Sequence, residues 1–186
     1  MKKTFTKIAL ALVLATTLSA CSKFDEINTS PTAANEDQVQ VEYFLNNAII
    51  SAQQDPNIAE RAFVLYWKTA ARQHLSTGIA GGTYNDDWTK EYWRYSSEWL
   101  NHANTAIEIA TIKEAQGTAQ VYNENLIQVS RIWRAYLMSE LSDNFGAIPI
   151  NAFQGVNPEF NSTKDVYYFL LEELKDASSK IDVSIN

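Results

Sequence analysis

Apolar side chains recur at helical spacing along most of the chain beyond residue 38. Residues 38–54, 57–75, 87–114, 119–142 and 164–181 each repeat apolar positions three and four residues apart, the spacing of one helix face. Asp55-Pro56 and Gly117 interrupt the pattern. It therefore predicts five helices joined by modest loops, an all-α fold that forms a helical-hairpin (tetratricopeptide-like) repeat array.

The same periodicity predicts which side chains face the core. The third helix has the broadest apolar face, built from Trp88, Tyr92, Tyr95, Trp99, Ala106 and Ala110, with Trp93, Leu100 and Ile107 beside it. In the fourth helix the expected inward residues are Leu126, Val129, Trp133, Tyr136, Leu137 and Leu141. In the fifth helix they are Val166, Phe169, Leu170, Leu174, Ala177 and Ile181. A face as wide as that of the third helix must pack against two neighbours.

A turn separates the last two predicted helices. Asp143–Gly146 should end the fourth helix, and we expect Gly146 to adopt a backbone angle that is costly for other residues. Ala147–Ile150 is predicted to be extended, because Pro149 disfavours helix in the residue before it. Ser162–Asp165 resembles a capping box and should begin the fifth helix.

The N-terminus has the three parts of a secretory signal. A start with three lysines precedes the apolar run Ile8–Ala15, and small or polar residues follow. The run is too short to span a bilayer, which needs about 20 apolar residues. Residues 1–20 are therefore predicted to be a signal peptide, and Leu18-Ser19-Ala20 stands directly before the only cysteine, Cys21.

Leu18–Cys21 resembles a bacterial lipobox. The resemblance implies a diacylglyceryl group on the Cys21 thiol, cleavage before it, and acylation of the new amino terminus, for example with palmitate. Ser22 stands where an inner-membrane retention signal has Asp, which favours the outer membrane, and Lys23 with Asp25-Glu26 resembles a surface-export signal. Residues 21–37 are polar and are predicted to be a lipidated tether.

Composition and charge exclude several classes of function. The chain has 22 acidic and 15 basic residues, and loss of the signal peptide leaves 12 bases against the same 22 acids. Phosphate backbones repel such an acidic protein, so no nucleic-acid partner is expected. A single cysteine allows no internal disulfide and no Cys-rich metal site.

No pattern of catalytic or metal-binding residues emerges. The loop at 78–87 lacks the lysine of a phosphate-binding loop, and His74 and His102 are not spaced as metal ligands. The carboxylates of Asp86-Asp87 and Glu172-Glu173 are sequence neighbours that should point in different directions, whereas glycoside hydrolysis needs two acids facing across a cleft. We expect no enzyme activity, catalytic residue, metal or cofactor.

Aromatic side chains are the candidate ligand contacts. Sugars present apolar C–H faces and polar rims, so an indole or phenol ring combines stacking with hydrogen bonding. Tyr84 and Trp88 lie near the glycine-containing loop, and two interpretations are open for them, a sugar platform or core packing. The helix-embedded tryptophans are predicted to be core: Trp93, Trp99 and Trp133.

The order of motifs along the chain is similar to that of the SusD/RagB family of outer-membrane nutrient-binding lipoproteins. Behind the lipobox and Phe24–Asn28, residues Leu141–Pro149 match the turn Leu-x-Asp-x-(Phe/Tyr)-Gly-x-(Ile/Val)-Pro. Val166–Ala177 then match the helix (Val/Ile)-Tyr-x-x-(Ile/Leu)-x-x-(Asp/Glu)-Leu-x-x-Ala of that family. The resemblance runs from about Cys21 to the last residue.

The resemblance implies a surface-exposed, lipid-anchored lipoprotein of the outer membrane. Such a protein binds a nutrient, oligosaccharide above all, and delivers it to a TonB-dependent transporter of the SusC type. Residues 38–186 would form the helical repeat domain, and because family members are longer, we expect the chain to be truncated at its C-terminus. A different hypothesis is a lipid-anchored helical-repeat scaffold that binds a protein partner and no nutrient.

Overall fold

The computed structural model describes residues 39–54, 71, 73, 86–151 and 158–185. Four helices form this part of the chain: α3 (Val41–Gln54), α6 (Asp86–Gln116), α7 (Asn123–Phe145) and α8 (Thr163–Lys180). All four belong to one compact unit that spans Gln40–Asn186. The described residues include no β-strand, only an isolated antiparallel bridge between Ile148 and Asn161. The predicted all-α class is confirmed.

The predicted helix bounds agree closely with the observed bounds for three helices, and one observed helix is shifted along the chain. Helices α3, α6 and α8 occupy the ranges expected at 38–54, 87–114 and 164–181 within three residues. Helix α7 begins and ends three to four residues later than the predicted 119–142, because it continues through Asp143-Asn144-Phe145 and ends only at Gly146. The predicted helix at 57–75 lies outside the described residues.

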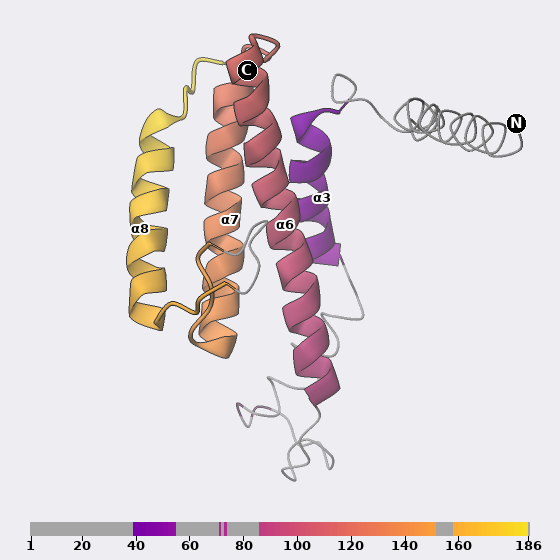
Figure 1. Ribbon diagram of the computed structural model, residues 1–186, viewed down its shortest axis with the longest axis vertical. Helices are drawn as coiled ribbons and strands as arrows, with labels where there is room; N and C mark the ends of the chain where they lie inside the picture. Colours follow the sequence, from indigo (N-terminus) through magenta and orange to yellow (C-terminus); the bar gives the residue numbers. More distant parts are fainter. Residues whose placement is uncertain (1–38, 55–70, 72, 74–85, 152–157, 186) are drawn as a thin grey trace, which may run out of the picture. The chain divides into compact units, whose positions relative to one another are not determined.

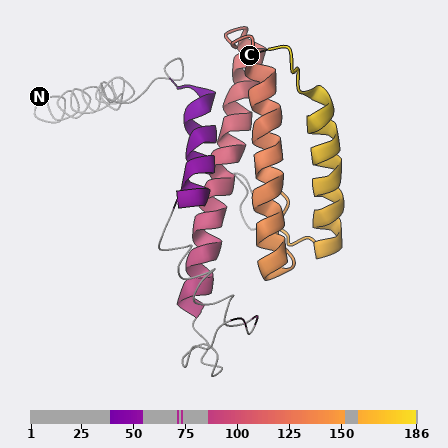
Figure 2. The ribbon, with the colours of Figure 1, turned by 180° about the vertical axis from the view of Figure 1, so that it is seen from behind.

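The four described helices pack side by side in the order α3, α6, α7, α8. Helix α6 lies between α3 and α7, and α7 lies between α6 and α8 (Figures 1 and 2). Successive helices α6, α7 and α8 run antiparallel (Figure 1). Asn123 fixes the first of these hairpins, since its buried side-chain amide donates to the Ala110 carbonyl oxygen at 3.0 Å and to the Glu114 carboxylate at 2.8 Å.

The core consists of three clusters of buried apolar side chains. Small residues dominate the contact of α6 with α3, where Ala106 and Ala110 have no exposed surface and pack with Val41 and Leu45. A second cluster joins α6 to α7 through Tyr92, Trp99 and Leu137. The third lies between α7, α8 and the turn that connects them, and contains Ala135, Met138, Leu141, Ile148, Val166 and Leu170.

The start of α8 confirms the predicted cap. Ser162 is the N-cap residue in extended conformation, and its hydroxyl oxygen accepts a hydrogen bond from the backbone N–H of Asp165 at 3.2 Å. This bond satisfies one of the N–H groups that have no partner within the first turn of a helix.

Three residues that periodicity predicted to be inward are exposed. Val129 and Tyr136 of α7 are 38% and 47% exposed, and Leu174 of α8 is 38% exposed. Helix α7 buries polar groups instead, because Gln128 and Ser130 lie on the sides that face its neighbours. Among the described helices α8 packs closely only against α7, so its buried stripe is narrower than its apolar stripe.

Within the described residues, no helix combines the length and apolarity needed to cross a bilayer.

Candidate functional site

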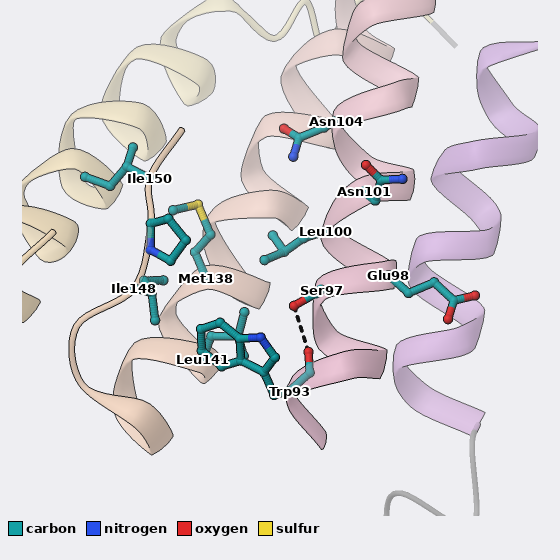
Figure 3. A pocket seen from close by; sticks show the side chains of 11 residues that line it. Trp93, Ser97, Glu98, Leu100, Asn101, Asn104, Met138, Leu141, Ile148 and Ile150 are labelled. Carbon is teal, nitrogen blue, oxygen red and sulfur yellow. Dashed lines mark hydrogen bonds between the residues drawn. The ribbon is translucent and has the colours of Figure 1, made fainter. Parts of the chain in front are cut away.

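A hollow of about 430 Å³ opens between α6, α7 and the segment that follows α7. This volume is within the range of small-molecule sites, roughly 300–1,000 Å³. Figure 3 shows that α6 forms one wall, α7 another, and the segment Ile148–Ile150 a third. The lining residues are Trp93, Ser97, Glu98, Leu100, Asn101, Asn104, Met138, Leu141, Ile148, Pro149 and Ile150.

The wall formed by α6 carries a polar stripe beside the apolar side chains of Trp93 and Leu100. Ser97, Asn101 and Asn104 follow one another at intervals of four and three residues, which keeps them near one side of the helix. The Ser97 hydroxyl donates to the backbone carbonyl of Trp93 at 2.7 Å, so its oxygen lone pairs are left to accept hydrogen bonds. Along the axis of α6 this wall therefore presents one hydroxyl and two amide groups to the hollow, each about one helical turn from the next.

The opposite wall is apolar. Met138 and Leu141 of α7 are almost fully buried, and so is Ile148. Pro149 and Ile150 continue this wall (Figure 3). An apolar wall that faces a polar one suits a ligand with one apolar and one hydroxylated side.

The turn after α7 holds the apolar wall in place. Gly146 has φ +80° and ψ −115°, which confirms the predicted special backbone angle, and Ser142 donates through its hydroxyl to the Gly146 carbonyl at 2.9 Å. Asn161 then binds the returning chain twice, because its backbone N–H donates to the Ile148 carbonyl at 2.9 Å and its side-chain oxygen accepts from the Ile150 N–H at 3.0 Å.

The remaining residues of the turn motif anchor it to neighbouring helices. The Tyr167 hydroxyl of α8 donates to the Asp143 carboxylate, and this bond raises the pKa of Tyr167 above its ordinary value. Phe145 meets the Trp93 ring edge-on, with centroids 5.0 Å apart. The sequence motif from Leu141 to Pro149 is therefore a structural device that carries Ile148 back against α7.

Trp93 packs against the core, as predicted, and also lines the hollow. Its partly buried ring contacts the buried cluster between α7, α8 and the turn that connects them. Phe160, which is 64% exposed, stacks on Trp93 with centroids 6.2 Å apart and an interplanar angle of 14°. Trp99 is core as predicted, with 6% of its surface exposed. Trp133 is partly buried and packs beside two of the core clusters.

A network of charged side chains supports α6, α7 and α8 behind Asn104. Glu173 of α8 accepts from Arg131 at 2.5 Å and from Arg134, and it is only 11% exposed. Arg131 also pairs with Asp176 at 2.7 Å. Burial by itself raises the pKa of Glu173, but the hydrogen bonds from the two guanidinium groups outweigh burial and hold that pKa below its ordinary value.

The predicted site residues are placed only in part. Cys21 and Tyr84 lie outside the described residues, and so does His74. The backbone of Trp88 lies in the first turn of α6, five residues before Trp93, while its side chain is outside the description. His102 is partly buried and shares a hydrogen bond of 3.0 Å with the Asn47 amide. In the described part of the chain, no three His, Cys, Asp or Glu side chains gather as metal ligands.

The polar wall was not anticipated from the sequence. Ser97, Asn101 and Asn104 share a face of α6 with Trp93, and a polar stripe inside a helix that is otherwise rich in aromatic residues is the signal that identifies them. A second cavity beside Tyr92 and Glu140 measures only about 20 Å³, enough for about one water molecule. The hollow beside Trp93 is therefore the better candidate for a ligand.

The chain matches a known protein family. A SusD-like family model, described as "Starch-binding associating with outer membrane", matches residues 31–186. No match was found among the curated proteins, and none among the solved structures.

Proposed function

The chain belongs to the SusD-like family, described as starch-binding and associating with the outer membrane, and from this premise we propose that it captures oligosaccharide in the hollow beside Trp93. The observation that carries the proposal is the pairing of a polar stripe on α6 with an apolar α7 wall. We propose a binding role without catalysis; among the described residues that line the hollow, Glu98 is the only ionisable side chain.

The physical fit concerns the two sides of a sugar ring. Pro149 and Ile150 present an apolar surface to the C–H face of a sugar, with the buried side chains of Met138 and Leu141 behind them. Ser97 and Asn101 present hydrogen-bonding groups to its hydroxyl rim. Trp93 adds an aromatic ring at one end. The volume of about 430 Å³ is enough for a short stretch of an oligosaccharide.

We test this proposal with calorimetric titration of maltoheptaose into the full chain. Trp93→Ala should weaken binding by about tenfold or more, because truncating an aromatic residue in a binding pocket costs roughly 1.4 kcal/mol or more. Asn101→Ala should weaken it less while leaving the melting temperature unchanged, since Asn101 is exposed. The matched comparison is the double variant Tyr84→Ala, Trp88→Ala. A loss confined to that double variant would place the sugar platform before α6 and reject the hollow.

Anchoring at the membrane is the second part of the proposal. Cys21 would carry the lipid and hold the domain at the cell surface through the polar residues 21–37. Cys21→Ala should release the protein from membrane fractions, because stable anchoring depends on several acyl chains on one residue. The measurement is partition between aqueous and detergent phases after fractionation, with Cys21→Ala compared with Ser22→Ala. Retention of the Cys21→Ala variant in the membrane would disprove lipidation.

Delivery to a transporter is the third part. We propose that the protein hands its ligand to a TonB-dependent transporter of the SusC type. The rival function, a scaffold that binds a protein and no nutrient, is favoured by the exposed apolar side chains of α8, where Tyr168 and Leu171 are 59% and 61% exposed. Co-purification with a TonB-dependent transporter, together with binding of maltoheptaose, supports delivery. Binding of a protein partner without binding of maltoheptaose supports the scaffold.

A further inference from the structure

We propose that Arg134 is a positioning residue that turns the amide of Asn104 into a fixed hydrogen-bond donor. Together with the acceptor Ser97 and the carboxylate of Glu98, this donor makes the hollow select neutral, hydroxyl-bearing ligands over carboxylated ones. This inference rests on the proposed function, because it names the class of saccharide that the same hollow takes.

Arg134 reaches from α7 to both neighbouring helices. One terminal nitrogen, Nη1, donates to the side-chain oxygen of Asn104 on α6 at 3.0 Å. The other, Nη2, donates to Glu173 on α8. The guanidinium also stands 5.9 Å from the centre of the Phe169 ring. Contacts on two sides hold the guanidinium plane, and that plane fixes where its N–H groups point.

The chemistry of the pair decides which way the Asn104 amide faces. A guanidinium has donors only, so the amide must turn its oxygen toward Arg134 and its NH2 group away. The nitrogen has no hydrogen-bond partner among the described residues, and Asn104 lines the hollow. In Figure 3 the Asn104 nitrogen lies on the side toward Met138. Asn104 therefore turns its donor group toward the ligand and its oxygen toward Arg134.

Ser97, on the same wall, provides a hydrogen-bond acceptor. Its proton is committed to the Trp93 carbonyl, so toward the ligand it offers an acceptor. Seven residues separate Ser97 from Asn104, which is about 10 Å along a helix. A ligand must thus give a proton at one end and accept one at the other. Hydroxyl groups do both, whereas an ionised carboxylate only accepts.

The charges around the hollow also disfavour a carboxylated ligand. Within the part of the chain that the structure describes, the only ionisable side chain that lines the hollow is Glu98, which is 54% exposed. The two nearby guanidinium groups are already paired with Glu173 and Asp176. The whole chain has a net charge of −7, and no unpaired cation among the described lining residues offsets the repulsion of an anionic ligand.

Arg131 provides a matched control. Like Arg134 it lies on α7 and donates to Glu173, but its other contacts are Gln128 and Asp176, and it does not touch Asn104. Arg131→Met and Arg134→Met each remove one guanidinium from Glu173 and keep a long side chain. Both should lower the melting temperature, but only Arg134→Met frees the Asn104 amide.

The first experiment follows the Asn104 side-chain NH2 in ¹H–¹⁵N spectra of the full chain without ligand, with Asn104→Asp used to assign the signal. We expect the signal to shift in Arg134→Met and to stay in place in Arg131→Met. Equal shifts in both variants, or no shift in either, would overturn the positioning role. This readout does not depend on any saccharide.

The second experiment titrates maltoheptaose and an oligogalacturonate of the same length into the wild type and both variants. We expect the wild type to bind maltoheptaose at least about tenfold more tightly, and Arg134→Met to lose about three- to tenfold in affinity, the effect of one hydrogen bond. Arg131→Met should lose less than about twofold. Equal losses in both variants, or equal affinity for the charged oligomer, would overturn the inference while leaving saccharide binding intact. A wild type that binds neither oligomer would overturn the proposed function as well.

Discussion

Glu173→Ala is expected to lower the free energy of unfolding by about 2–4 kcal/mol, because it leaves two guanidinium groups without their shared partner between α7 and α8. The value lies slightly below that of a fully buried pair, since Arg131 and Arg134 are 16% and 21% exposed. Urea unfolding followed by circular dichroism measures it. The control is Glu172→Ala, an exposed neighbour that should change stability by less than about 0.5 kcal/mol. Equal effects at the two positions would show that the network does not stabilise the packing of α8.

The same variant should change how stability depends on pH. The pKa of Glu173 is lower in the folded protein than its ordinary value of 4.5, since two guanidinium hydrogen bonds outweigh the opposing effect of burial. A carboxyl group with a lowered pKa contributes stability above its ordinary value, and this contribution is lost as pH falls through the lower, folded value. Wild-type stability should therefore decline below about pH 4.5 more steeply than that of Glu173→Ala. Asp176, whose pKa is lowered by Lys180 and Arg131, leaves a smaller acid dependence in the variant.

Gly146→Val is expected to lower the free energy of unfolding by about 1–3 kcal/mol. The cause is the backbone, because Gly146 holds φ +80° and an added Cβ would meet only the Thr163 hydroxyl at 3.8 Å, an ordinary contact. Gly146→Ala should consequently show a large part of the loss, although alanine is small. Thermal unfolding of both variants measures the effect, and Ala147→Val, one residue along on an exposed position, is the control. An unchanged melting temperature in both Gly146 variants would contradict a strained turn.

The ligand site shows where sequence reasoning succeeded and where it did not. The residues of the turn from Leu141 to Pro149 were recognisable, and the structure confirms that Gly146 redirects the chain. The hollow was not predictable, because it requires Ile148–Ile150 to return beside α6, and that return depends on Asn161, eleven residues beyond Ile150. That Trp93 lines this hollow as well as packing against the core was not predictable for the same reason, since helical spacing gives the face of a residue but not what lies opposite.

The sequence by itself determined the all-α class, the positions of α3, α6 and α8, and the capped start at Ser162. These features depend on side chains three to four residues apart, which local physics decides. Only the tertiary structure decided the exposure of Val129 and Tyr136, because α7 pairs the polar side chains of Arg131 and Arg134 with carboxylates of α8 instead of following its apolar stripe. A burial pattern set by partners about 40 residues away in the chain cannot be derived from the period of one helix.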